Sequence, residues 1–202
     1  MIQSCSGQWA VFSPLHTNAQ QGNNEIMKPA NHKILILIAG LPGTGKTTFA
    51  ARLAEEIGAI HLNTDKMRFR MGQMGHYDPE DKEAVYRALH QEVREGLLAG
   101  RPVVVDATFY LRKLRSPFLQ LAAACESPVC WIEIRAEEST VRERIAGKRA
   151  FSEADFGVYQ KIKSTCEPLD MDRLILWSDQ LTPEQMAGKA IAYLKGTIPS
   201  TS

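Results

Sequence analysis

A phosphate-binding loop near the start of the chain constrains its fold more than any other feature. Residues 40–48 read G-L-P-G-T-G-K-T-T, which contains the pattern G-x-x-x-x-G-K-T. An apolar run at 34–39 precedes this loop, and a helix-forming run at 46–57 follows it. A strand, this loop and a helix in that order predict a nucleoside triphosphate site. The alternative, an ordinary glycine-rich turn, would not require all three parts together.

The residue types in the loop suit the binding of phosphates. Gly40, Gly43 and Gly45 let the backbone turn tightly and place no Cβ in the way of a phosphate. Successive backbone N–H groups and the helix N-terminus then bind anionic oxygens. Lys46 is expected to neutralise the β- and γ-phosphates, and the Thr47 hydroxyl to ligate Mg²⁺. The residues expected to contact the nucleotide are Gly40, Leu41, Pro42, Gly43, Thr44, Gly45, Lys46, Thr47 and Thr48.

The composition and net charge of the chain limit the kinds of molecule that it is expected to bind. The chain has 202 residues, of which 44% are hydrophobic and 23% charged, as in an ordinary globular protein. Its net charge of +1 supplies no broad basic field, so there is no strong evidence for binding to long nucleic acid. A small-molecule acceptor or a short nucleic acid would require no such field.

The sequence shows no signal for export or for a membrane. No apolar run reaches the length of a membrane span, and the N-terminus lacks a basic region followed by an apolar one. The four cysteines form no C-x-x-C pair and have no histidine at a zinc-like spacing; they are Cys5, Cys125, Cys130 and Cys166. We therefore expect reduced thiols and a cytoplasmic protein.

Residues 1–32 differ in composition from the remainder of the chain. They are rich in Gln, Asn, Ser and His, which predicts a flexible extension, and the functional domain is expected at 33–202. Within that domain, strands are expected at 34–39, 59–62, 103–105, 129–134 and 174–177, and helices at 46–57, 81–98, 113–124, 137–147, 152–165 and 183–195. This alternation predicts an α/β fold with a five-stranded parallel sheet that helices cover on both faces. Its ligands should lie beyond the carboxyl ends of the strands.

Two carboxylates follow strands at that edge. Asp106 closes the strand at 103–105 and is expected to hold Mg²⁺, directly or through water. Motor-type ATPases commonly carry a glutamate at the next position, which is Ala107 here, so transfer to a bound acceptor is favoured over mechanochemical hydrolysis. Asp65 follows the second strand and could accept a hydroxyl proton, with Arg68 on the same helical face. The competing interpretation, about equally favoured by the residues alone, makes Asp65 a helix N-cap and Arg68 a surface residue.

A second basic cluster, Arg112, Lys113 and Arg115, could line an acceptor pocket that binds a phosphate. The plainer interpretation, which we favour, is the exposed start of a helix. Three tyrosines are typical of core or rim positions, although each could stack on a sugar or a base: Tyr77, Tyr86 and Tyr110.

Four motifs together resemble those of a known enzyme group. Besides the loop at 40–48, they are Asn-Thr-Asp-Lys-Met-Arg at 63–68, Val-Val-Val-Asp-Ala-Thr-Phe at 103–109, and a basic segment at 142–149 followed by Ser-Glu-Ala at 152–154. The chain resembles the P-loop kinases that include phage polynucleotide kinase, zeta-toxin kinases and chloramphenicol phosphotransferase, over about residues 33–195. The resemblance implies the three-layer P-loop NTPase fold with a small helical lid at about 137–165.

The resemblance also implies roles for individual residues. Asp65 matches the general base of polynucleotide kinase, and Arg68 the arginine that helps to hold the reacting groups. Asp106 and Thr108 match a strand end near the acceptor and the metal. The lid of the family supplies basic side chains to the transferring phosphate, and the matching positions are Arg144, Lys148 and Arg149. Lysine at 148 gives charge without the bidentate fork of the arginine found in many relatives.

The sequence therefore favours an ATP-dependent kinase that uses Mg²⁺ and phosphorylates a hydroxyl group. The acceptor remains open among a nucleic-acid 5′-hydroxyl, a nucleoside, a sugar nucleotide and an antibiotic-like alcohol. The usual nucleoside monophosphate kinase signature is absent after the third strand, and ATP is the default because no Asn-Lys-x-Asp guanine signature occurs. The alternative is an ATP-binding regulatory module with slow ATPase activity that grips a protein partner through residues 1–32.

Overall fold

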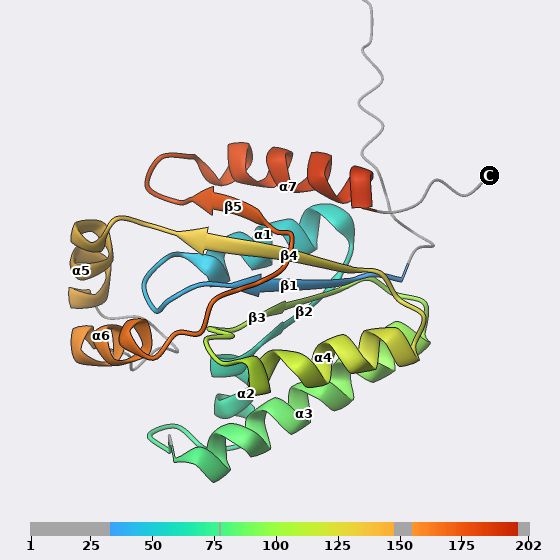
Figure 1. Ribbon diagram of the computed structural model, residues 1–202, viewed down its shortest axis with the longest axis horizontal. Coiled ribbons are helices and arrows are strands. Elements are labelled where there is room, and N and C mark those ends of the chain that lie inside the picture. Colours follow the sequence, from blue (N-terminus) through green and yellow to red (C-terminus); the bar gives the residue numbers. More distant parts are fainter. Residues whose placement is uncertain (1–32, 77, 148–154, 198–202) are drawn as a thin grey trace, which may run out of the picture.

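Five parallel strands form a sheet at the centre of the computed structural model, which describes residues 33–76, 78–147 and 155–197 (Figure 1). The strands are β1 (Leu35–Ala39), β2 (Ile60–Asn63), β3 (Val103–Asp106), β4 (Val129–Arg135) and β5 (Leu174–Trp177). The helices are α1 (Lys46–Ile57), α2 (Thr64–Arg70), α3 (Pro79–Leu98), α4 (Arg112–Ala124), α5 (Glu138–Ala146), α6 (Phe156–Ser164) and α7 (Pro183–Thr197). The strand order β2-β3-β1-β4-β5 confirms the expected α/β fold.

The side chains of β1 alternate between the two faces of the sheet and so create two cores. Leu35 and Leu37 pack with α3 and α4 on one face, whereas Ile36 and Ile38 pack with α1 and α7 on the other. This separation follows from the two-residue period of a strand. All five residues of β1 are buried, as expected for the central strand of a parallel sheet.

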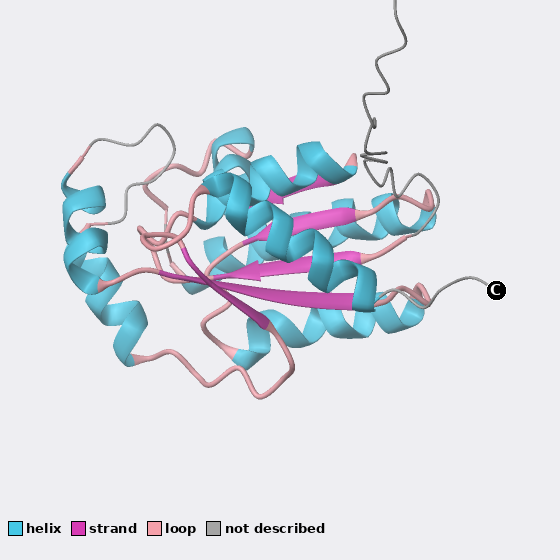
Figure 2. Cartoon of the chain, turned by 90° about the horizontal axis from the view of Figure 1, so that it is seen from above, coloured by secondary structure: helices cyan, strands magenta, loops and turns pink. Residues whose placement is uncertain are grey.

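The two helical layers leave one end of the sheet for ligands. Figure 1 shows α1 and α7 above the sheet and α3 and α4 below it, while α5 and α6 lie beyond the tips of the strands. Figure 2 shows the same three groups from above, with α5 and α6 together at one end. Strand β1 pairs with β3 on one side and β4 on the other, so the chain order reverses at its carboxyl end. Ligands of open α/β sheets bind at such a reversal.

The structure shifts some of the expected boundaries. The second strand runs from Ile60 to Asn63 rather than over 59–62, so a polar side chain ends it. The helix expected at 81–98 begins at Pro79, a residue whose fixed φ suits the first helical turn. The helix expected at 152–165 is described only from Phe156 onward. The proposed extension, residues 1–32, lies outside the described residues.

The interpretation of the second basic cluster as the exposed start of a helix is wrong for Arg115, because this side chain is buried. Its residue is only 2% exposed, and its guanidinium donates hydrogen bonds to the carbonyls of Phe109 (3.2 Å), Glu167 (3.2 Å) and Pro168 (2.9 Å). Burial of the cation is possible because these carbonyls and the nearby Glu167 carboxylate replace water. The side chain thereby fastens the connector between α6 and β5 to the loop after β3.

In the described ranges, no helix is both long and apolar enough to cross a membrane.

Replacing the buried guanidinium should destabilise the fold. We expect Arg115→Met to lower the free energy of unfolding by about 2–3 kcal/mol, because three carbonyls lose their donor. Urea denaturation of Arg112→Met provides the matched control. Its side chain forms an exposed ion pair with Asp170, so its loss should change stability by no more than about 0.5 kcal/mol. Equal effects of the two substitutions would contradict the fastening role of Arg115.

Candidate active site

The phosphate-binding loop joins β1 to α1 and is packed from two sides. At Gly40, a Cβ would lie 2.6 Å from the Ile134 carbonyl oxygen of the neighbouring strand β4. At Gly43, φ is +84° and a Cβ would lie 3.0 Å from the side chains of both Val141 and Ile145 on α5. Glycine at these positions therefore permits both the turn and the close approach of its neighbours.

The loop is also held by its own hydrogen bonds. The Thr44 hydroxyl donates to the Leu41 carbonyl oxygen at 2.9 Å, and Gly45 is the N-cap residue of α1. Lys46 and Thr47 begin α1 and are half-buried, whereas Thr48 is exposed. The helix N-terminus consequently faces the concave side of the loop, where its N–H groups and dipole favour an anion.

A buried carboxylate connects this loop to the next two strands. Asp106 is fully buried, and its Oδ2 accepts hydrogen bonds from Thr47 Oγ1 (2.7 Å) and Asn63 Nδ2 (2.7 Å). The other oxygen, Oδ1, lies 2.5 Å from His61 Nε2, which acts as the donor because a carboxylate only accepts. Three donors thus compensate the cost of removing this charge from water.

The Asp106 carboxylate and the Thr47 hydroxyl supply oxygen ligands that suit Mg²⁺ bound together with a triphosphate. Carboxylate and hydroxyl oxygens are the ligands that this hard cation prefers, and it keeps several waters and phosphate oxygens in its shell. Among the described residues no group of three or more His, Cys, Asp or Glu side chains could hold a metal by itself. Thr47 and Asp106 therefore fit the two protein ligands, direct or through water, that the sequence predicts.

Helix α2 places the predicted acceptor-side residues. Asn63 is its N-cap, and the Asn63 Oδ1 atom accepts a hydrogen bond from the Lys66 backbone N–H at 2.8 Å. Asp65 lies in the first turn and is half-buried. Arg68 is 5% exposed, and its Nε donates to the His76 carbonyl oxygen at 3.1 Å. The interpretation of Asp65 as the N-cap and Arg68 as a surface residue is therefore wrong.

A chain of hydrogen bonds links α5 to the loop. Arg144 donates from Nη1 to Ser178 Oγ (2.8 Å) and from Nη2 to the Ser178 carbonyl oxygen (3.0 Å). The Ser178 hydroxyl in turn donates to the Thr44 carbonyl oxygen at 2.6 Å. Arg144 thus lies beside the loop, as the resemblance implies. The other two predicted lid residues, Lys148 and Arg149, lie outside the described residues.

Sequence reasoning did not identify His61, Asn63 or Ser178 as parts of this site. His61 and Asn63 share one face of β2, and Asn63 pairs in register with Asp106. Polar residues at alternate positions of this strand could therefore have indicated that both side chains face Asp106. For Ser178, which follows β5, no local pattern indicates contact with the loop.

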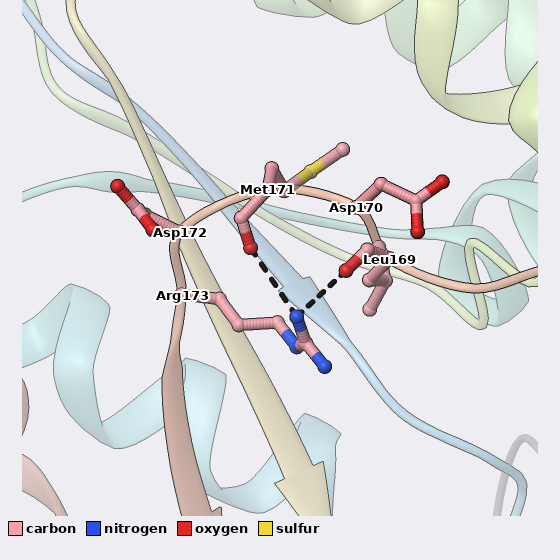
Figure 3. Close-up of a pocket in the computed structure, with 5 residues that line it drawn as sticks. All are labelled: Leu169, Asp170, Met171, Asp172 and Arg173. Carbon is pink, nitrogen blue, oxygen red and sulfur yellow. Dashed lines mark hydrogen bonds between the residues drawn. The ribbon is translucent and has the colours of Figure 1, made fainter.

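Glu133, Arg135 and Arg173 form a cluster of charged side chains that stabilises the structure. Figure 3 shows Arg173 folded back on its own connector, where Nη1 donates to the carbonyls of Leu169 (2.7 Å) and Met171 (3.2 Å). Its Nε donates to Glu133 Oε2 at 2.6 Å. Burial alone would raise the pKa of Glu133, but hydrogen bonds from Arg135 and Arg173 hold that pKa below its usual range. These groups fix the approach to β5 by pairing with one another.

Comparison with known proteins agrees with the loop and the fold. A family profile described as "AAA domain" matches residues 35–169, and the chain belongs to this family. Together, the loop, the sheet order and this membership define a P-loop protein with a site for ATP and Mg²⁺.

Individual relatives extend the comparison. An uncharacterised protein of Mycobacterium tuberculosis is 29% identical over 126 residues, which are 56% of this chain and 25% of the relative. The chain thus spans about a quarter of the length of that relative. A shikimate kinase of Thermobifida fusca is 41% identical over 73 residues, 35% of this chain and 42% of that enzyme. The solved structure of a sugar kinase from a Janibacter species aligns with a TM-score of 0.63 at 21% identity, over 83% of this chain and 97% of the other.

His61 should orient the Asp106 carboxylate. We expect His61→Ala to lower the free energy of unfolding by about 1–3 kcal/mol, because a buried charge loses a donor. The affinity of the ATP-bound protein for Mn²⁺, measured by electron paramagnetic resonance, should fall about tenfold. His76→Ala removes an exposed imidazole and should change neither quantity. Unaltered Mn²⁺ affinity in His61→Ala would show that His61 does not position the carboxylate.

Ser178 should support the shape of the loop. Ser178→Ala removes the hydroxyl that bridges Arg144 and Thr44, with an expected cost of about 1–2 kcal/mol, or about 5–30-fold in ATP affinity. Isothermal titration with ATP measures this change. The matched variant Ser116→Ala removes an exposed hydroxyl that donates to the Arg112 carbonyl oxygen within α4, and it should bind ATP normally. Equal affinities for both variants would contradict a supporting role.

Proposed function

We propose that this chain transfers the γ-phosphate of ATP to a hydroxyl group of a small-molecule or short nucleic-acid acceptor. The observation that carries the proposal is the hydrogen-bonded set of Thr47, Asn63 and Asp106. It joins the phosphate-binding loop to the strand end from which α2 begins. The candidate base, Asp65, therefore lies within one helical turn of Asn63, which donates a hydrogen bond to the Asp106 carboxylate.

Each side chain has a distinct task in this proposal. The backbone of the loop and Lys46 bind the β- and γ-phosphates, while bound Mg²⁺ would neutralise the charge that develops on the phosphate oxygens. The oxygen of the acceptor hydroxyl bonds to the γ-phosphorus, and Asp65 accepts the proton that this hydroxyl loses. The bond between that phosphorus and the β–γ bridging oxygen breaks, and ADP leaves with the electron pair.

Arginine side chains complete the proposed site. Arg68 holds the acceptor side of the reaction through its place on α2. Arg144, with Lys148 and Arg149 from the following segment, supplies positive charge to the transferring group. Arg144 already reaches the Thr44–Gly45 turn through Ser178, which supports this assignment.

The named relatives support phosphotransfer as the reaction class. The relatives include a shikimate kinase and a sugar kinase, whose names describe transfer to small molecules. Ala107, which follows Asp106, offers no carboxylate to activate water at that position. The nucleic-acid 5′-hydroxyl, nucleoside, sugar nucleotide and antibiotic-like alcohol remain candidate acceptors. The regulatory alternative depends on residues 1–32, outside the described part of the chain.

Loss of the proposed base should separate transfer from ATP binding. We expect Asp65→Asn to slow acceptor phosphorylation by about 10²–10⁴-fold, because the amide cannot take the hydroxyl proton. ATP affinity should stay within about twofold, since Asp65 does not touch the phosphates in this proposal. Radiolabelled ATP and calorimetric titration measure the two quantities.

The control Asp172→Asn, an exposed aspartate in the connector before β5, should leave both quantities unchanged. Undiminished transfer by Asp65→Asn would rule out Asp65 as the base. A regulatory module would instead show acceptor-independent hydrolysis that is insensitive to Asp65 and depends on Lys46.

A further inference from the structure

A groove between α3 and α4 is a cavity that the proposed chemistry does not use. It has a volume of about 520 Å³, within the range of small-molecule sites. Figure 1 shows the first turns of both helices at the end of the molecule where α5 and α6 lie, and several residues that line the groove belong to these turns. Its walls are formed by Pro79, Lys82, Glu83, Tyr86, Arg87, His90, Tyr110, Leu111, Lys113, Leu114, Pro117 and Phe118.

The floor of this groove is aromatic. Tyr86 meets Phe118 edge-to-face at a centroid distance of 6.2 Å, and His90 meets the same ring at 5.9 Å. Tyr110, Leu111 and the two prolines add further apolar surface. Such walls suit the face of a ring, since aromatic side chains stack on sugars and bases.

The rim is basic. The lining residues include three cations, Lys82, Arg87 and Lys113, and one carboxylate, Glu83. Among the salt bridges of the described residues, none involves these three cations. Burial lowers the pKa of Lys82, the charges of Lys161 on α6 and Arg68 on α2 lower it further, and the charge of Asp78 raises it. Lys161 and Arg68 do not line the groove, but their charges act on Lys82, and an anion beside Lys82 would relieve this repulsion.

The groove is connected to the proposed active site at two points. Arg68, whose charge reaches Lys82, shares α2 with Asp65. The Tyr86 hydroxyl interacts with the Thr108 side chain and the Phe109 backbone, in the loop that directly follows Asp106. Phe109 adopts a left-handed φ of 47° and is held there by edge-to-face contacts with Tyr86, Phe118 and Trp131.

We propose that this groove binds the distal part of the acceptor, and that the acceptor is therefore a ring-bearing molecule with a phosphate or carboxylate group. The ring lies against Tyr86, and the anion pairs with Lys82 and Lys113. The hydroxyl to be phosphorylated then extends past Arg68 toward Asp65. This assignment rests on the proposed function, since it names the acceptor class of the same site.

Direct binding tests the groove without any turnover. With the nucleotide site saturated by AMPPNP, calorimetry compares uridine with 3′-UMP and 5′-UMP, and glucose with glucose 6-phosphate. We expect at least one phosphorylated probe to bind tenfold or more tightly than its neutral partner. The double variant Lys82→Gln/Lys113→Gln should abolish that difference, because it removes both charges and keeps polar side chains.

The control is Lys189→Gln/Lys195→Gln, which neutralises two exposed lysines of α7 on the opposite face of the sheet. It should retain the preference for the phosphorylated probe. Equal affinity for charged and neutral probes, or an equal loss in both double variants, would overturn the proposal. So would a preference for the phosphorylated probe that survives in Lys82→Gln/Lys113→Gln.

Turnover separates this proposal from the proposed function. For any probe that is phosphorylated, the groove variant should raise the KM for the anionic probe about tenfold and leave kcat and the KM for ATP unchanged. Charge-dependent binding without phosphorylation of any probe would uphold the groove as an anion site and contradict the proposed transfer. Phosphorylation of neutral probes alone would uphold the transfer and overturn the groove.

Discussion

The architecture of the site depends on one buried charge. Asp106 has no solvent exposure, so its carboxylate requires donors from the protein, and these come from two separate segments of the chain. Thr47 approaches from the phosphate-binding loop, and Asn63 and His61 from β2. Because Asn63 also caps α2, the same contact sets the start of the helix that carries Asp65. The phosphate-binding loop, the end of β2 and the start of α2 are thereby held in one arrangement.

A second set of contacts joins the phosphate-binding loop to the end of the sheet beyond β5. Ser178 donates to the Thr44 carbonyl and accepts from Arg144, while Val141 and Ile145 of α5 pack against Gly43. The helix that carries Arg144 therefore contacts the loop directly. A change in the loop on nucleotide binding would be transmitted to α5 through packing and hydrogen bonds that already exist.

The sequence predicts those features that local patterns determine. The loop at 40–48, the strand before it and the carboxylate at Asp106 follow from a motif and from strand periodicity, and all lie where the pattern implies. The sequence alone left Asp65 as either a base or the N-cap of α2, and the structure gives the N-cap to Asn63, which bonds Lys66 and Asp106. The contacts of Ser178 and Arg115 could not be predicted for another reason. Their partners are distant in sequence, with Thr44 134 positions from Ser178, so only the folded chain brings them together.

The central claim is that the bound phosphate passes to a hydroxyl rather than to water. The most direct measurement follows γ-labelled ATP with Mg²⁺ under single-turnover conditions and determines how the label divides between inorganic phosphate and each acceptor class. The account predicts Mg²⁺-dependent label on one class of hydroxyl acceptor, formed faster than phosphate is released. Label that appears only as inorganic phosphate, at a rate that no acceptor changes, would contradict it.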